Sequence, residues 1–174
     1  MITIIIGTNR HYAKSKWVAH WVKELLDERQ IESQFLDLAE LPPDVTVSAL
    51  YENSGKNEQL NALSQKMLGS ERFFFIVPEY NGSFPGVLKT FIDALPYPSP
   101  LGGKRAALIG ISSGMQGGGL ALSHFTDILH YLGVQVLAQK PKLAFIEKNL
   151  KGDALDNNLY LQLLTEQVEA FLEF

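Results

Sequence analysis

Three short stretches of this sequence gather side chains that can bind a small ligand. They are GTNRHYAKS (residues 7–15, followed by Lys16), PEYNGSFPG (78–86) and SSGMQGGG (112–119). The first places hydroxyls, an amide and cations directly ahead of a helical pattern, and the unpaired N–H groups and dipole of a helix N-terminus favour an anion. We interpret it as a cradle for a terminal phosphate, formed by Thr8, Arg10, Ser15 and Lys16.

A simpler interpretation of the first stretch stays open. Thr8 and Asn9 fit a turn, Ser15 fits a helix cap, and Arg10 fits a solvated surface position. Two specific phosphate motifs are absent, namely G-x-G-x-x-G for a dinucleotide and G-x-x-x-x-G-K-S/T for a nucleoside triphosphate. If the stretch binds phosphate, a terminal monophosphate is the better match.

The second stretch combines an aromatic ring, an amide and a flexible backbone position. Tyr80 can lie against a flat ring, Asn81 can pair with its polar edge, and Gly82 lets the backbone come close. The sequence assigns no role to Glu79. The alternative to ligand binding is that this stretch is only a turn with an exposed tyrosine. We favour ligand binding, because a mere connection needs far less varied chemistry.

The third stretch has almost no side chains. Its backbone N–H groups can face the electron-rich edge of a planar ligand, at Gly114, Gly117, Gly118 and Gly119. A glycine-rich loop is a weak indicator by itself, so the inference depends on where the fold places it.

The composition excludes several other kinds of function. A net charge of -4 offers no basic surface for nucleic acid and no polybasic membrane patch. Because there is no cysteine, thiolate catalysis and iron–sulfur clusters are excluded, and redox chemistry requires a bound cofactor. His124 and His130 are six residues apart, so they share no helical face, and no G-x-S-x-G elbow is present. We expect neither a metal site nor a serine-hydrolase site.

The length of the chain bears on the number of domains, and its first residues bear on the expected localisation. With 174 residues, 46% of them apolar, residues 1–174 suit a single domain with a substantial core. The sequence starts MITIII, without a basic leader, and no apolar run approaches the roughly 20 residues of a membrane helix. We therefore expect a cytoplasmic protein.

Hydrophobic periodicity predicts alternating strands and helices. Apolar runs predict strands at residues 2–6, 34–38, 72–77, 105–112 and 134–137. Helical spacing predicts a helix after each of the first four strands, the third of them capped by Ser83, and a closing helix over 156–174. This alternation predicts an α/β, flavodoxin-like fold, a doubly wound parallel sheet of five strands in the order 2-1-3-4-5 with helices on both faces. Ligands bind such sheets at the carboxyl ends of the strands, where the three stretches fall.

One helix carries more apolar residues than a single contact with the sheet requires. They are Phe84, Val87, Leu88, Phe91, Ile92 and Leu95, with Tyr97 beyond them. Burying the surplus against a second copy predicts a homodimer or homotetramer, in which the second subunit would also wall the ligand site.

Together these stretches resemble the NAD(P)H-dependent FMN reductases, a flavodoxin-like family that includes quinone and azo-dye reductases. Gly7, Thr8 and Arg10 match the family's Gly-Ser/Thr-x-Arg-x-x-Ser loop. Residues 78–89 match its Pro-Glu-Tyr-Asn-x-Ser-x-Pro-Gly-x-Leu-Lys stretch, and residues 113–119 match its glycine-rich loop. The likeness runs in order over about residues 3–146.

The resemblance implies an FMN cofactor and NADPH or NADH as co-substrate. It implies that Thr8, Arg10 and Ser15 hold the phosphate of FMN. The residues implied around the ribityl chain and the flavin are Pro78, Glu79, Tyr80, Asn81, Ser113, Gly114, Gly117 and Gly118. Hydride would pass from the nicotinamide through FMN to a free flavin, a quinone or an azo compound, with no side-chain acid or base. The N–H groups near Gly117 and Gly118 would stabilise negative charge on the ring.

One feature departs from the family pattern. The family has two residues between its arginine and its serine, whereas His11, Tyr12, Ala13 and Lys14 separate Arg10 from Ser15. Either the loop bulges and Ser15 still reaches the phosphate, or another donor replaces it.

The rival hypothesis is a flavodoxin-type one-electron carrier, which binds FMN but does not oxidise a nucleotide. Such carriers tend to present a strongly acidic face, and a net charge of -4 over 174 residues is mild. The sequence therefore favours the reductase.

Overall fold

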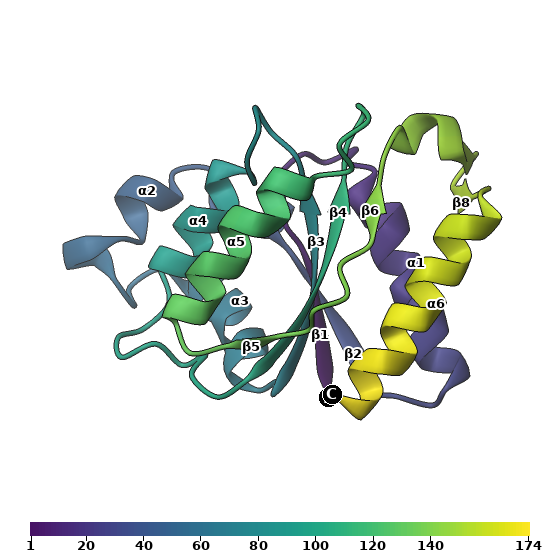
Figure 1. Cartoon of the computed structure of the whole chain (residues 1–174). Helices are drawn as coiled ribbons and strands as arrows, with labels where there is room; N and C mark the ends of the chain where they lie inside the picture. The colour runs from purple at the N-terminus through teal and green to yellow at the C-terminus, as the bar shows by residue number, and fades with distance from the viewer.

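A parallel sheet forms the middle layer of the structure, which is a computed structural model and describes residues 1–174 (Figure 1). Its five main strands are β1 (Ile2–Ile6), β2 (Ser33–Asp37), β3 (Arg72–Pro78), β4 (Arg105–Ile111) and β5 (Gln135–Val136). They pair in parallel in the order β2-β1-β3-β4-β5. The predicted fold class and strand order are confirmed.

The three central strands are almost continuously apolar because helices cover both faces of the sheet. Every residue of β1 is buried, and so is every residue of β3 and β4 after the arginine that begins each of them. The register places Phe73 and Phe74 of β3 beside Ala106 and Ala107 of β4, so two bulky rings have small neighbours. The carboxyl ends of these strands meet at one edge of the sheet.

Helices flank the sheet on both sides (Figure 1). One face is covered by α1 (Ser15–Glu28) and α6 (Asn158–Glu173), and the other by α3 (Glu58–Leu68), α4 (Gly86–Asp93) and α5 (Gly119–Tyr131). None of these helices combines the length and the hydropathy needed to cross a membrane. The shorter elements are α2 (Val45–Ser48), β6 (Lys142–Leu143), the hairpin of β7 (Leu150–Lys151) and β8 (Ala154–Leu155), and 3-10 turns at Leu38–Glu40, Tyr51–Asn53 and Ile146–Asn149.

Each face of the sheet has its own apolar core. On the side of α1 and α6, the rings of Phe74 and Phe171 meet edge to face with centroids 4.7 Å apart. On the other side, Phe75 and Phe125 make the same kind of contact at 5.0 Å. Edge-to-face pairs of this kind add to the stabilisation that burial provides. The loops at the carboxyl edge are therefore attached to a rigid double-sided core.

The fifth strand is interrupted. The sequence predicts a strand over 134–137, but the chain leaves the sheet after β5 and returns as β6, which pairs with the carboxyl end of β4. Between the two, Gln167 of α6 donates its Nε2 to the carbonyl oxygens of Leu108 and Gln139, at 2.9 Å each. A side chain thus replaces the backbone donor that the interruption removes.

The start of α4 differs from its prediction. The helix begins at Gly86 with Pro85 at its N-cap, so the prediction that Ser83 caps it is wrong. Ser83 instead closes a tight turn with Tyr80, and its Oγ lies 3.0 Å from Nδ1 of His124. Turn formation takes Ser83 out of reach of the first helical N–H groups.

The apolar stripe of α4 is buried within the single chain. Its members are buried or packed against the core on that face, namely Phe84, Val87, Leu88, Phe91, Ile92 and Leu95. Only Tyr97, at 97% exposure, projects into solvent. The stripe therefore gives no separate argument for a second copy, and the homodimer or homotetramer stays a prediction.

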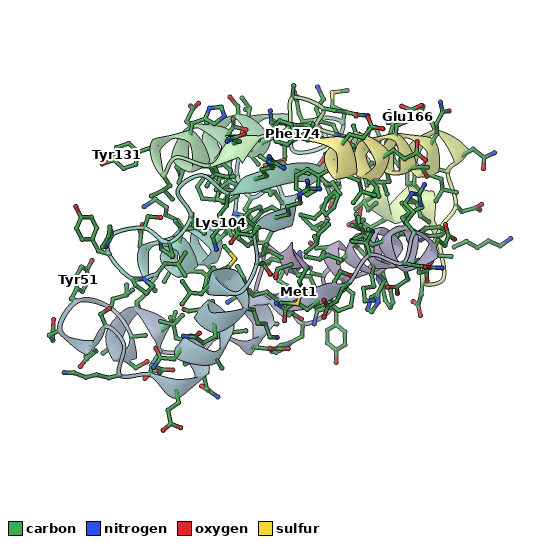
Figure 2. The ribbon with its side chains drawn as sticks, turned by 90° about the horizontal axis from the view of Figure 1, so that it is seen from below. Met1, Tyr51, Lys104, Tyr131, Glu166 and Phe174 are labelled. Carbon is green, nitrogen blue, oxygen red and sulfur yellow. The ribbon has the colours of Figure 1, made fainter.

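Lys104 is buried at the edge of the sheet opposite the ligand stretches, directly before β4 (Figure 2). Its Nζ donates to the carbonyl oxygens of Met67, Leu68 and Ser70 at 3.2, 3.1 and 2.7 Å, which satisfies carbonyl groups at the end of α3. Both chain termini lie at this same edge (Figure 1).

Candidate functional site

A cleft lies at the carboxyl ends of β1, β3 and β4, between the loops that follow these strands. The segment after β6 supplies a further wall. The lining residues are Thr8, Arg10, Tyr12, Ala13, Lys14, Ser15, Pro78, Glu79, Tyr80, Ile111, Ser112, Ser113, Ile146 and Glu147. The structure thus brings the first two predicted stretches together with the start of the third, at the place that the fold predicts.

The start of α1 provides donors that have no acceptor in the protein. Lys14 occupies the N-cap position without a capping side chain, and the first turn contains no acidic residue. The backbone N–H groups of Lys14 and Ser15 make no hydrogen bond with the protein. The Oγ of Ser15 is fully buried and also has no partner. Helix starts are normally satisfied by a cap or an anion, and here the free donors can bind an anion.

Ser15 lines the cleft despite the two extra residues that precede it. A turn from Arg10 to Ala13 takes up the added length, and the N–H of Ala13 donates to the carbonyl of Arg10 at 3.2 Å. Of the two alternatives that the sequence left open, the structure therefore matches the bulged loop that keeps Ser15 at the site.

The two lysines beside Ser15 point to different places. Lys14 lines the cleft with Arg10, and neither cation has a carboxylate partner. The Nζ of Lys16 lies 2.6 Å from Oδ2 of Asp37, which ends β2, outside the cleft. The predicted phosphate residues Thr8, Arg10 and Ser15 therefore come together, while Lys16 does not join them.

The loop after β3 is a tight hairpin turn. Tyr80 and Ser83 exchange backbone hydrogen bonds of 2.7 and 3.0 Å, and Asn81 and Gly82 between them have φ values of +50° and +78°. Positive φ at both central positions is the reason that Asn-Gly favours this turn. The Oε1 of Glu79 accepts the N–H of Gly82 at 2.6 Å. Glu79 and Tyr80 line the cleft, whereas Asn81 lies exposed at the tip of the turn.

The glycine-rich loop is folded against the sheet. A Cβ on Gly117 would lie 2.7 Å from the backbone of Lys142, and one on Gly118 would lie 3.1 Å from the N of Ile111. The N–H of Gly117 donates to Oγ of Ser112 at 2.9 Å. Gly114, Gly117 and Gly118 are outside the cleft lining, and the N–H of Gly117 already has its acceptor. Ser113 alone of the predicted residues in this loop faces the cleft.

Sequence reasoning missed the wall that follows β6. Ile146 donates its N–H to the carbonyl of Ser112 at 3.0 Å, and Ser113 donates its Oγ to Oε1 of Glu147 at 2.9 Å. These contacts place Ile146 and Glu147 in the cleft. Neither residue belongs to a motif, and the strand before them is two residues long, so no local pattern marks them. Three further lining residues, Tyr12, Ala13 and Lys14, lie in the first loop. In the sequence they are marked only by the greater length of that loop compared with the family pattern.

Comparison with known proteins identifies the family. The model of a family described as NADPH-dependent FMN reductase matches residues 1–145. A 2-hydroxy-1,4-benzoquinone reductase of Burkholderia sp is 30% identical over 180 residues, covering 98% of this chain and 95% of that protein. The solved flavoenzyme NAD(P)H:(acceptor) oxidoreductase of Paracoccus denitrificans has a TM-score of 0.78 at 25% identity, covering 99% of this chain and 94% of that one.

A more distant structural neighbour confirms the fold alone. The Streptococcus pneumonia TIGR4 flavodoxin has a TM-score of 0.67 at 12% identity, covering 99% of this chain and 97% of that one. The family match extends over most of the chain and includes the loops after β1, β3 and β4. The chain therefore belongs to the NADPH-dependent FMN reductase family, and FMN and NAD(P)H are the cofactor and co-substrate that this membership implies.

Proposed function

We propose that this chain holds FMN in the cleft at the carboxyl ends of β1, β3 and β4 and reduces a quinone with NAD(P)H. The quinone is proposed because a relative over almost the whole chain is named for a benzoquinone substrate. Free flavin and azo compounds are the alternative acceptors. The observation that carries the proposal is the unsatisfied start of α1, where a fully buried hydroxyl and two backbone N–H groups have no acceptor.

The donor set fits the terminal phosphate of FMN. Ser15 Oγ and the N–H groups of Lys14 and Ser15 are free donors, and Arg10 adds an unpaired guanidinium. Charge-assisted hydrogen bonds to a phosphate are among the stronger polar contacts in proteins. Thr8 supplies a further hydroxyl, and it is held in place by Tyr80. We assign phosphate binding to Thr8, Arg10 and Ser15.

The remaining lining residues suit a flat, partly polar molecule. Tyr80 offers an aromatic ring, Ser113 a hydroxyl, and Ile111 and Ile146 offer apolar surface. FMN, when bound, supplies the redox chemistry: NAD(P)H gives up a hydride, and the quinone takes two electrons and two protons to become a hydroquinone. The residues of this chain bind and orient, and we assign none of them as an acid or a base. The proton that the hydride does not supply comes from solvent.

Anaerobic reduction tests the proposal directly. NADPH or NADH, added to the flavin-loaded protein without any helper protein, is expected to bleach the yellow flavin absorption. Adding a benzoquinone is then expected to restore it. If the nucleotide and the quinone use one site in turn, steady-state rates varied in both substrates give parallel double-reciprocal lines. Colour that persists for minutes with an excess of either nucleotide would contradict the proposal and favour a one-electron carrier.

We also propose that the protein assembles as a homodimer or homotetramer. The support is exposed aromatic side chains in the loop after α4 and at the end of α5. Tyr97 and Tyr131 are 97% and 90% exposed, and Tyr131 projects away from the body of the molecule (Figure 2). A hollow beside Tyr131 is lined by the apolar residues Ile92, Ile128 and Leu132 and by the charged residues Lys89, Asp93 and Asp127. Light scattering at micromolar concentration tests this, and a monomer would contradict it.

A further inference from the structure

We propose that Lys14, which lies in the extended part of the first loop, is a phosphate ligand of FMN in this chain, and that Lys16 is not. The inference rests on the proposed function and adds a cation that the family's Gly-Ser/Thr-x-Arg-x-x-Ser pattern does not contain. It depends on four observations at the start of α1, which concern placement, charge pairing, the helix end and a buried hydroxyl.

Placement separates the two lysines. Lys14 and Lys16 are two positions apart at a helix start, and successive helical residues are rotated by about 100°. The two side chains therefore leave the helix on nearly opposite sides, and only one of them can face the cleft. Lys14 lines it, beside Arg10 and Ser15, and Lys16 does not.

Charge pairing distinguishes the same two residues. Lys16 has its counterion within the protein, since its Nζ lies 2.6 Å from Oδ2 of Asp37. Lys14 is half-buried and forms neither an ion pair nor a side-chain hydrogen bond. A partly buried ammonium group without a partner is unfavourable. A negatively charged ligand therefore gains a favourable charge interaction with Lys14, whereas Lys16 already interacts with Asp37.

The helix end makes an unpartnered lysine more unusual. The N-terminal end of a helix carries partial positive charge, and acidic residues or capping side chains are favoured there. In α1 the N-cap is Lys14 itself, no side chain caps the helix, and the first turn contains no acidic residue. Two cations, Lys14 and Arg10, thus meet the positive end of a helix dipole at one place. An anion bound at this point interacts favourably with all three positive charges.

Ser15 supplies the independent indication that an anion binds here. Its side chain is fully buried and lines the cleft, yet its Oγ has no hydrogen-bond partner. Buried hydroxyls are almost always paired, so an unpaired one that faces a cleft points to a ligand acceptor. Because Ser15 directly follows Lys14, a phosphate that accepts from Ser15 lies next to the backbone and side chain of Lys14. The family's pattern leaves the residue directly before its serine unspecified, and in this chain that residue is a lysine.

Flavin titrations with matched variants test this inference. The full-length protein, stripped of flavin, is titrated with FMN and with riboflavin, which lacks the phosphate, while flavin fluorescence is followed. Lys14→Gln is expected to weaken FMN binding by about tenfold and to leave riboflavin binding within about twofold. Lys16→Gln and the charge-matched Lys23→Gln, whose lysine pairs with Asp27 on the exposed side of α1, are expected to change FMN binding by about twofold or less. Raising the salt concentration is expected to reduce the difference between Lys14→Gln and the unmodified chain.

The outcomes separate this inference from the proposed function. If the unmodified chain binds FMN no better than riboflavin, the phosphate cradle itself is wrong. If it prefers FMN and Lys14→Gln keeps that preference, the cradle stands and the role of Lys14 is overturned. An equal loss for FMN and riboflavin, or a loss with Lys16→Gln as large as with Lys14→Gln, also overturns it. Far-UV circular dichroism of each stripped variant checks that its overall helix content equals that of the unmodified chain.

Discussion

The hydroxyl of Tyr80 lies 2.8 Å from Oγ1 of Thr8, and this hydrogen bond joins two loops that are 72 residues apart in the chain. Thr8 is fully buried, and its Oγ1 also receives the backbone N–H of Arg10 at 3.4 Å. Tyr80 therefore does more than offer a ring to a ligand. It also fixes the position of the Thr8 hydroxyl in the cleft that both residues line.

Replacing Tyr80 by Phe tests this link between the two loops. The ring is kept and only the hydrogen bond to Thr8 is lost, so FMN binding is expected to weaken by about two- to tenfold, or 0.5–1.5 kcal/mol. Riboflavin binding is expected to change less, because the affected hydroxyl serves the phosphate. Fluorescence titration measures both, and Tyr51→Phe, at a residue that is 84% exposed and outside the cleft, is the control. An equal loss for both flavins would assign Tyr80 to the ring alone.

Ser15→Ala is expected to change stability and binding in opposite directions. The stripped protein loses a buried hydroxyl that has no partner, so its free energy of unfolding is expected to stay the same or rise by up to about 1 kcal/mol. The affinity for FMN is expected to fall, because the phosphate loses a donor. Urea denaturation and flavin titration measure the two effects, with the exposed Ser123→Ala as the control. A less stable stripped protein would mean that Ser15 has a structural partner.

Glu79→Gln is expected to lower the rate of flavin reduction by NADPH by less than about tenfold, or ~1.4 kcal/mol of barrier. The Oε1 of Glu79 accepts the N–H of Gly82 at 2.6 Å, and a glutamine oxygen can accept the same hydrogen bond. The role assigned to Glu79 is therefore to shape the turn. Stopped-flow absorbance of the anaerobic protein measures the rate. A loss of several hundredfold with FMN still bound would instead reveal a catalytic side chain.

Gln167→Met is expected to lower the free energy of unfolding by about 1–2 kcal/mol, because the loss of two hydrogen bonds outweighs the removal of its buried, unpaired Oε1. Methionine has a similar volume but no N–H, so the carbonyl groups of Leu108 and Gln139 lose the donor that they share. The midpoint of urea denaturation measures the change. Gln162→Met on the exposed side of α6 is the control, with an expected effect within about 0.5 kcal/mol. Equal effects of the two substitutions would show that the interruption of the sheet needs no side-chain donor.

The central strands could be predicted because their burial dictates their composition. β1, β3 and β4 are covered on both faces, and a strand of this kind has a nearly continuous run of apolar residues that is visible in the sequence. The sequence predicts a second strand over 34–38, which the structure shifts by one residue to Ser33–Asp37. The interruption between β5 and β6 could not be predicted, because it depends on a glutamine more than 20 residues further along the chain. Long-range contacts of this kind leave no periodic signal.

The site could be predicted in outline but not in its individual contacts. Topology and three motifs locate the cleft, and the order of the strands explains why. Which of Lys14 and Lys16 faces it depends on where α1 begins, and helix ends are the least certain part of any sequence reading. For Asn81 the Asn-Gly pair also carries a strong turn signal. In the structure Asn81 lies at the exposed tip of this turn, so turn formation explains why an asparagine stands at this position.

The interrupted fifth strand also has a consequence for how copies of the protein can meet. An exposed edge strand presents unpaired N–H and C=O groups, which invite strand addition by another chain and aggregation. On the β4 side the outer strands β5 and β6 are two residues each, and the chain bends away between them. Within that gap, the Nε2 of Gln167 donates a hydrogen bond to the carbonyl oxygen of Leu108 in β4. A neighbouring molecule therefore finds no continuous backbone ladder to extend on this side, and association there must proceed through side chains.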